Sequence, residues 1–255
     1  MPGVVVSRLF QLLMIVVALL VSTLQAQESS GYKILKSLKH NSGYFTQGLE
    51  VHDGLMFESS GGYGKSKLRK YPPGADNTLL EIPLQEKYFA EGLSVFSDEL
   101  FVLTWRENTL FVLDPDNLQI KRELTYEGQG WGLASNSTQL IMSDGSDTIY
   151  FRDPQSFAIE KELQVRYQQH SVRRINELEF AQGYLWANIW RSPFIIKIKP
   201  TTGAVVAFYD FTELVMENSA GNKESVLNGI AYDAELGAYW ITGKLWPRRY
   251  LVSFD

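Results

Sequence analysis

Short apolar segments recur along the chain, each opened by a glycine followed by leucine or isoleucine. The segments begin at Phe45, Phe89, Gly130, Ile175 and Leu227, and Glu177 replaces the glycine of the fourth copy. From Leu49 the apolar position recurs after steps of 44, 40, 45 and 52 residues. A period of about 40–50 residues is typical of solenoids and propellers.

Each start is followed by a turn and by further strands rich in β-branched and aromatic residues. Second strands are expected at residues 55–60, 100–105, 140–145, 185–190 and 239–244. Third strands are expected at 66–71, 109–113, 148–152, 194–199 and 250–254. Fourth strands are expected at 78–84, 119–125, 158–165 and 204–211. Proline and glycine turns separate them, so each copy is predicted to be one antiparallel four-stranded blade.

The fifth copy ends at Asp255 after three strands, and residues 32–38 precede the first copy as an unassigned strand. Pairing the N-terminal and C-terminal strands in one blade closes the ring and removes a free sheet edge. We therefore predict an all-β fold, a five-bladed β-propeller. An ordinary β-sandwich does not explain five copies in register. A polar insertion at 212–225 interrupts the pattern, and its start is compatible with a short helix.

Residues 1–26 have the features of a secretory signal, with Arg8, an apolar run from Leu9 to Leu20, and Ala26 at the cleavage edge. The alternative is a membrane anchor, but the run is short for a bilayer span of about 20 residues. We expect a single domain over residues 27–255 in an exported, periplasmic or secreted protein. The oligomeric expectation is a monomer without stable membrane association.

Composition removes several classes of function. The chain has no cysteine, which excludes disulfides and cysteine metal sites, and its net charge of −5 gives no sign of nucleic-acid binding. The three histidines, His40, His52 and His170, lack the spacing of a zinc helix. Serine elbows, phosphate loops and dinucleotide fingerprints are absent as well. We expect no metal and no cofactor.

Equivalent positions of a circular array converge on one axis, so the residue that precedes each glycine-leucine pair is a candidate site residue. These residues are Gln47, Glu91, Trp131, Asn176 and Asn228. The aligned ends of the second strands are Ser60, Trp105, Gly145, Trp190 and Lys244. Together with Phe45 and Phe89 they predict a small aromatic pocket with a few polar groups, the usual design of a ligand site.

Glu91 is the clearest acid–base candidate in this set. Apolar surroundings raise the pKa of a carboxyl, because desolvation disfavours its charged form, and such a group exchanges protons near neutral pH. Lys244 adds a cation. Plainer roles exist for each group: the aromatic residues pack, the amides satisfy turn backbone groups, and the lysine is solvated. No structural role common to the repeats requires a carboxylate at position 91.

The motifs of all five copies resemble those of the plant-type and bacterial glutaminyl cyclases, over essentially the whole mature chain. The resemblance is carried by Phe45–Leu49, Glu58–Gly64, Phe89–Leu93, Gly130–Gly132, Ile175–Leu178, Trp186–Trp190, Leu227–Ile230 and Gly243–Trp246. That family is a five-bladed propeller, unrelated to the animal-type zinc cyclases.

The resemblance implies conversion of N-terminal glutamine to pyroglutamate with release of ammonia, and peptides or proteins with N-terminal glutamine as partners. By motif, Glu91 matches the catalytic glutamate. Phe45, Gln47, Phe89, Trp105, Trp131, Asn176, Trp190 and Lys244 match pocket residues, whereas Asn228 rests on repeat equivalence alone. The sequence does not decide whether Lys244 or an amide stabilises the oxyanion. The alternative function is a non-catalytic propeller that binds a peptide or sugar at the same mouth.

Overall fold

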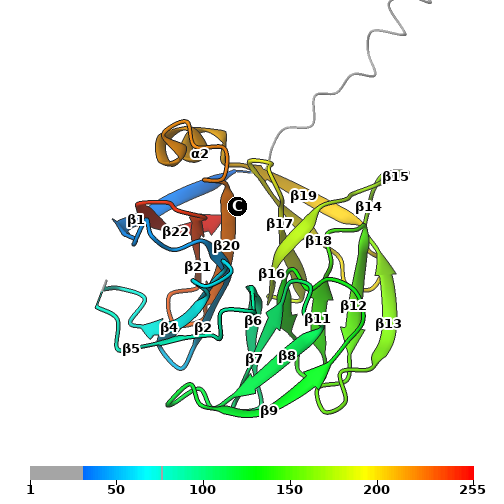
Figure 1. The fold of residues 1–255 in the computed structure, drawn as a ribbon. Coiled ribbons are helices and arrows are strands. Elements are labelled where there is room, and N and C mark those ends of the chain that lie inside the picture. Colours follow the sequence, from blue (N-terminus) through cyan, green and yellow to red (C-terminus); the bar gives the residue numbers. More distant parts are fainter. Residues whose placement is uncertain (1–30, 76) are drawn as a thin grey trace, which may run out of the picture.

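Strands of the computed structural model form five four-stranded antiparallel sheets arranged as a ring, a five-bladed β-propeller (Figure 1). The structure describes residues 31–75 and 77–255. The expected leader, residues 1–26, lies outside this part of the chain. The predicted fold class is confirmed, and in the first four blades the strand order outward from the axis follows the chain.

The strands agree with the sequence pattern to within about two residues. The first blade consists of β2 (Thr46–His52), β3 (Leu55–Ser60), β4 (Lys67–Tyr71) and β5 (Leu80–Pro83). The second consists of β6 (Ala90–Phe96), β7 (Glu99–Thr104), β8 (Thr109–Leu113) and β9 (Ile120–Thr125). The third consists of β10 (Leu133–Ser135), β11 (Leu140–Ser143), β12 (Thr148–Arg152) and β13 (Ile159–Gln164). The fourth consists of β16 (Ile175–Ala181), β17 (Tyr184–Ile189), β18 (Phe194–Ile198) and β19 (Val205–Asp210).

The ring closes as predicted. The fifth blade takes β20 (Leu227–Asp233), β21 (Ala238–Gly243) and β22 (Arg248–Phe254) from the C-terminal end and β1 (Tyr32–Lys39) from the N-terminal end. Strand β1 runs antiparallel to β22, with Tyr32 opposite Phe254 and Lys39 opposite Arg248. Figure 1 shows the blue β1 against the red β22. The two ends of the propeller are thus fastened by backbone hydrogen bonds.

The repeated glycines let the inner strands of adjacent blades touch. A Cβ atom on Gly92 would lie 2.4 Å from the backbone nitrogen of Leu133, and one on Gly132 would lie 2.0 Å from the backbone oxygen of Asn176. The Gly92 N–H donates to the Trp131 carbonyl at 2.7 Å. In the fourth copy Glu177 takes the glycine position, and its carboxylate accepts the N–H groups of Leu49 and Ile230. The glycine pattern therefore reflects backbone contact near the axis.

Inner strands are irregular at the positions where the candidate site residues lie. Pairing with the second strand shifts register between Thr46 and Gly48, and between Ala90 and Leu93. The same happens at 175–178 and 227–230 in the last two blades. Such β-bulges redirect a side chain out of the regular alternation and are common next to active sites. Here they set the orientation of the residues that precede Gly-Leu.

Two features lie outside the four-strand repeat. The insertion forms helix α2 (Thr212–Ser219), which ends at Ala220 in a left-handed conformation with φ 44°. A short hairpin of β14 (Arg166–Tyr167) and β15 (His170–Ser171), which the pattern did not predict, connects the third and fourth blades. Both lie between the outer strand of one blade and the inner strand of the next, on the face where the inner strands begin. No helix among the described residues is long and apolar enough to cross a membrane.

Candidate active site

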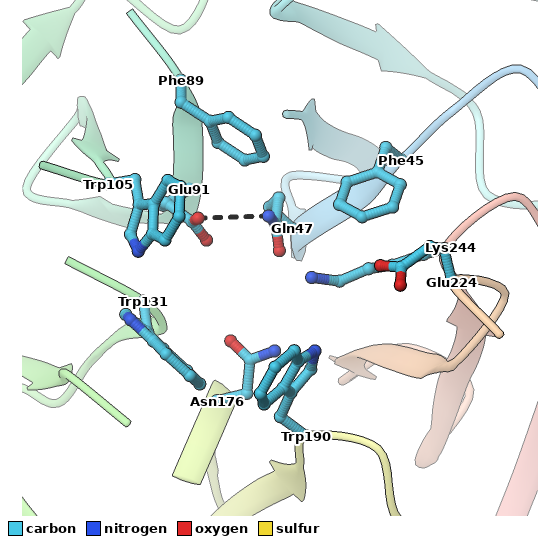
Figure 2. A pocket seen from close by; sticks show the side chains of 10 residues that line it. All are labelled: Phe45, Gln47, Phe89, Glu91, Trp105, Trp131, Asn176, Trp190, Glu224 and Lys244. Atoms are coloured by element: carbon cyan, nitrogen blue, oxygen red, sulfur yellow. Dashed lines mark hydrogen bonds between the residues drawn. The ribbon is translucent and has the colours of Figure 1, made fainter. Parts of the chain in front are cut away.

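A cavity of about 290 Å³ opens where the inner strands begin, and nine of the ten predicted site residues line it (Figure 2). Its walls are Phe45, Gln47, Phe89, Glu91, Trp105, Trp131, Asn176, Trp190, Glu224 and Lys244. Apart from Glu224, which lies between α2 and β20, these residues come from all five blades, at or just before the start of an inner strand or at the end of a second strand. The propeller thus brings together residues that are up to about 200 positions apart in sequence.

Glu91 is the buried carboxylate of the cavity, with 5% of its surface exposed. Its Oε1 accepts a hydrogen bond from Gln47 Nε2 at 3.1 Å. Burial raises the pKa of Glu91 well above the ordinary value, Lys244 opposes this shift, and Glu107 adds to it. Because the shift brings the pKa of this carboxyl closer to neutral pH, the group is better suited than an ordinary carboxylate to take up and release a proton there.

Lys244 approaches from the opposite wall, and Figure 2 shows its ammonium directed into the cavity. It is 4% exposed, and its Nζ lies 4.7 Å from the centroid of the Phe45 ring. Burial lowers the pKa of Lys244 to about 8, although Glu91 and Glu224 raise it. The ammonium therefore lies against an aromatic face, the charges of the two carboxylates favour its protonated form, and its pKa is close to neutral pH. The plainer expectation of a solvated lysine does not fit this burial.

The aromatic walls are fixed in mutually perpendicular or tilted contacts. The Trp131 and Trp190 rings lie 5.6 Å apart at 82°, and Phe89 and Trp105 lie 5.5 Å apart at 60°. Gln129, which the sequence pattern did not single out, accepts the indole N–H groups of Trp105 at 2.8 Å and of Trp131 at 3.2 Å. One side-chain oxygen therefore sets the orientation of two walls.

The predicted amides have different surroundings. Gln47 and Asn176 line the cavity, and Gln47 Oε1 is buried without a hydrogen-bond partner among the described residues. Asn228, in contrast, is not part of the cavity wall. Its Nδ2 donates to the Thr46 carbonyl at 3.0 Å, across the junction of the fifth and first blades. The side chain of Asn228 fastens the closing blade, and repeat equivalence alone did not place it in the cavity.

Glu224 lines the cavity but was not foreseen, because it belongs to the insertion and has no equivalent in other copies. Its Oε1 accepts from Arg191 Nη2 at 2.7 Å, and both side chains are about half exposed. The guanidinium of Arg191 lies 4.6 Å from the Trp190 ring centroid. This ion pair forms part of the rim, whereas Glu91 is at the buried end.

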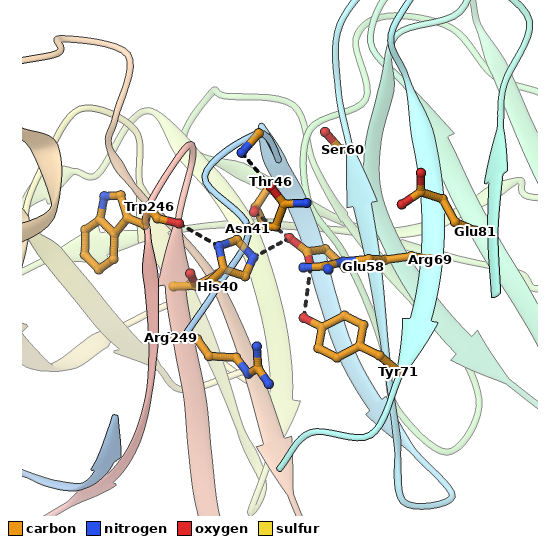
Figure 3. A network of polar contacts seen from close by, with 12 residues as sticks. His40, Asn41, Thr46, Glu58, Ser60, Arg69, Tyr71, Glu81, Trp246 and Arg249 are labelled. Atoms are coloured by element: carbon orange, nitrogen blue, oxygen red, sulfur yellow. Dashed lines mark hydrogen bonds and ion pairs between the residues drawn. The ribbon is translucent and has the colours of Figure 1, made fainter. Parts of the chain in front are cut away.

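A buried polar network behind the cavity holds the turn that carries Lys244 (Figure 3). Its centre is Glu58, which accepts hydrogen bonds from His40 at 2.9 Å, Thr46 at 2.6 Å, Arg69 at 2.7 and 2.9 Å, and Tyr71 at 2.9 Å. Burial raises the pKa of Glu58, but the charges of His40 and Arg69 and these hydrogen bonds outweigh burial and hold it well below its usual range.

The same network reaches the turn through His40. The other ring nitrogen of His40, Nδ1, lies 2.8 Å from the Trp246 carbonyl. Both ring nitrogens of His40 therefore lie within hydrogen-bond distance of an oxygen atom. The Leu245 N–H also donates to the Tyr44 carbonyl at 2.7 Å. These contacts fix the backbone on either side of Phe45 and next to Lys244.

Comparisons with known proteins agree with the propeller fold and indicate the family. The family model described as glutamine cyclotransferase matches residues 9–254. The chain belongs to the glutamine cyclotransferase family. It is 35% identical over 225 residues to a glutaminyl-peptide cyclotransferase of Arabidopsis thaliana, covering 87% of this chain and 70% of that protein.

A crystal structure of the glutaminyl cyclase of Myxococcus xanthus superposes with a TM-score of 0.82 at 37% identity. The match covers 88% of this chain and 96% of that chain. The predicted family is thereby confirmed. The fold shared with that cyclase is a propeller, as the sequence predicted. The candidate site of this protein lies at the mouth of the central axis of the propeller.

Proposed function

We propose that this cyclotransferase converts N-terminal glutamine of peptides and proteins to pyroglutamate with release of ammonia, and that Glu91 transfers the proton. The observation that carries the proposal is a single buried carboxylate of raised pKa, hydrogen-bonded to Gln47 and facing Lys244 in a small aromatic cavity. Membership of the family supports the reaction type.

The cavity suits one glutamine residue. Its volume is near the lower end for ligand pockets, and the aromatic walls favour a folded side chain over an extended, hydrated one. The free acceptor of Gln47 and the carboxylate of Glu91 together provide two oxygen atoms for the substrate ammonium. Holding the amine against the side-chain amide carbon makes the attack intramolecular and well oriented.

The proposed reaction starts with transfer of one proton from the α-ammonium, with a pKa near ~8, to Glu91. The free amine then attacks the side-chain amide carbon, and the new carbon–nitrogen bond closes a five-membered ring. The carbonyl oxygen becomes an oxyanion, which the Lys244 ammonium stabilises. Glu91 then gives its proton to the departing amide nitrogen and takes the second proton from the ring nitrogen. The oxyanion returns to a carbonyl as the old carbon–nitrogen bond breaks, and the released ammonia leaves as ammonium with the proton that Glu91 holds.

The cellular setting proposed for this enzyme rests on the sequence. Residues 1–26 have the composition of a secretory signal. We assign the mature enzyme to an extracytoplasmic space, where it acts as a monomer on exposed N-termini. The proton transfers involve side chains of the chain itself and require no metal.

Ammonia release from a glutamine-initiated peptide tests the proposal. A peptide that starts with glutamine is expected to lose one ammonia, while the same peptide starting with asparagine or with an acetylated glutamine is not. The acetylated peptide is a strict control because it lacks the attacking amine. Tight binding of the first peptide without any ammonia release would instead support a non-catalytic peptide-binding propeller.

A further inference from the structure

A second, more open hollow of about 370 Å³ lies beside the cavity on the same face, between helix α2 and the turn after β17. Its lining is largely apolar. The residues are Arg191, Ser192, Pro193, Thr212, Val215, Met216, Lys223, Val226 and Leu227. We refer to this hollow as the α2 groove.

Helix α2 is anchored by one stripe of residues and presents another to the groove. Leu214 packs into the core, and Asn218 donates to the Leu214 carbonyl and to the Tyr250 hydroxyl, each at 2.8 Å. Val215 packs partly buried against the same core cluster, whereas Met216 is 73% exposed. The helix is thus fastened to the core, while Val215 and the exposed Met216 contribute apolar surface to the groove.

The groove adjoins the active-site cavity through consecutive residues on both of its sides. Trp190 lines the cavity and Arg191 lines the groove, while Glu224 lines the cavity and Lys223 lines the groove. The Arg191–Glu224 ion pair, with its 2.7 Å contact, is the boundary that the two hollows share. A peptide with its first residue in the cavity therefore passes this pair when it turns toward blade five.

The opposite side of the mouth carries charged side chains next to its aromatic rings. There the Glu107 carboxylate accepts from the Tyr63 hydroxyl at 2.8 Å and from the Phe89 N–H at 3.3 Å. Arg106 covers the Trp105 ring, with 3.7 Å between the guanidinium carbon and the ring centroid. An apolar side chain gains more by burial against Val215, Met216 and Pro193.

We infer that the α2 groove is a subsite for an apolar side chain of the peptide substrate, within the first few residues after its N-terminal glutamine. The inference rests on the proposed function and deepens it. It makes this enzyme selective for N-termini in which glutamine is followed at short range by a leucine-like residue. The selectivity is expected in KM, because the groove does not touch the reacting atoms and binds ground state and transition state alike.

A leucine scan tests the subsite. Glutamine followed by glycines is compared with peptides that carry one leucine at the second, third, fourth or fifth position. With the wild-type enzyme, leucine at one of these positions is expected to lower KM on the order of 10-fold relative to the all-glycine peptide. This is the gain typical of burying an apolar side chain. In Met216→Asp the ratio of kcat/KM between that peptide and the all-glycine peptide is expected to fall to near unity. In Val215→Ser the same ratio is expected to fall less, because only part of the apolar surface of the groove is lost.

Leu236→Asp is the matched control. Leu236 is also exposed, at 57%, but lies in the turn between β20 and β21 at the far end of the blade, so the wild-type ratio is expected to persist. Because each variant is judged by a ratio of two substrates, a general loss of fold or catalysis cancels. Equal kcat/KM for all leucine positions in wild type, or a preference that survives Met216→Asp, overturns the subsite. Absence of turnover with every peptide overturns the proposed function and the subsite with it.

Discussion

Replacing Glu91 by glutamine is the most direct perturbation of the proposed mechanism. The substitution keeps the size of the side chain and an oxygen that can accept the Gln47 N–H, now at 3.1 Å from Oε1 of Glu91. It removes the ability to take up a proton. The cavity walls, the Gln129 contacts to the tryptophans and the Glu58 network are left in place.

The expected loss of kcat depends on whether another side chain of the cavity could replace Glu91 as the base. The other carboxylate of the cavity wall, Glu224, is half exposed and paired with Arg191 at the rim. It is therefore a poor substitute. General acid–base catalysis typically contributes about 10²–10⁴-fold, which corresponds to roughly 2.7–5.4 kcal/mol of barrier. We expect kcat to fall by that factor with KM little changed, since the aromatic walls and Lys244 still bind the substrate.

The pH profile separates this role from a structural one. In wild type, kcat/KM is expected to rise with pH as Glu91 loses its proton, at a pKa raised by burial. It is expected to fall again as Lys244, with a pKa of about 8, loses its proton. In Glu91→Gln the rising limb is lost. The falling limb moves to lower pH, because the negative charge that raised the pKa of Lys244 is gone.

The assay is continuous detection of released ammonia from a glutamine-initiated peptide, with thermal unfolding measured on the same samples. Glu224→Gln is the control and is expected to retain most of the activity. The melting temperature of Glu91→Gln should be no lower than that of wild type, since burying an amide costs less than burying a carboxylate. Wild-type kcat in a folded Glu91→Gln protein would refute the proton-transfer role, as would an unchanged acid limb.

Four further outcomes are expected. Glu58→Gln removes the negative charge that faces Arg69 in a buried network and should lower the free energy of unfolding by about 3–5 kcal/mol. This corresponds to a melting temperature lowered by roughly 10 °C, and a shift under a degree would contradict it. Gln129→Leu should raise KM several-fold, whereas Gln129→Glu, which keeps an acceptor for the two indole N–H groups, should have a KM near that of wild type. Equal KM values in both variants would show that these hydrogen bonds do not orient the tryptophans for binding. Burial raises the pKa of Glu179 to about 7, so the native state binds more protons than the unfolded one and stability falls from about pH 4.3 to pH 7. Glu179→Gln should flatten this slope in melting curves, and an unaltered slope would speak against it. Dialysis against a chelator should leave turnover intact, and a loss that added metal reverses would disprove metal independence.

Buried carboxyl groups near the propeller axis affect stability as well as activity. Glu177, on inner strand β16 of the fourth blade, accepts the Leu49 N–H of the first blade and the Ile230 N–H of the fifth. Burial and the charge of Glu179 raise its pKa well above the usual value. Carboxyl groups near the axis are thus stabilising as hydrogen-bond acceptors and destabilising as charges. Their cost grows as pH rises through their raised pKa values.

Much of this architecture was contained in the sequence. The five-fold period predicted the blades, because each copy is one supersecondary unit with the same hydrophobic spacing. The truncated fifth copy predicted the pairing of β1 with β22, since an unpaired edge strand needs a partner. Glu91, Lys244 and the aromatic walls were found because they occupy repeated positions that a ring must bring to one axis.

The tertiary structure decided the contacts that do not repeat. Glu224 enters the cavity from an insertion, and Gln129 joins two tryptophans from a connection, so neither has an equivalent in other copies. Asn228 occupies a repeated position, yet it turns to the Thr46 carbonyl at the closing blade. A repeat alignment places a residue along a strand. The β-bulge and the packing of the neighbouring blade set the direction of its side chain, and both depend on residues that are distant in the sequence.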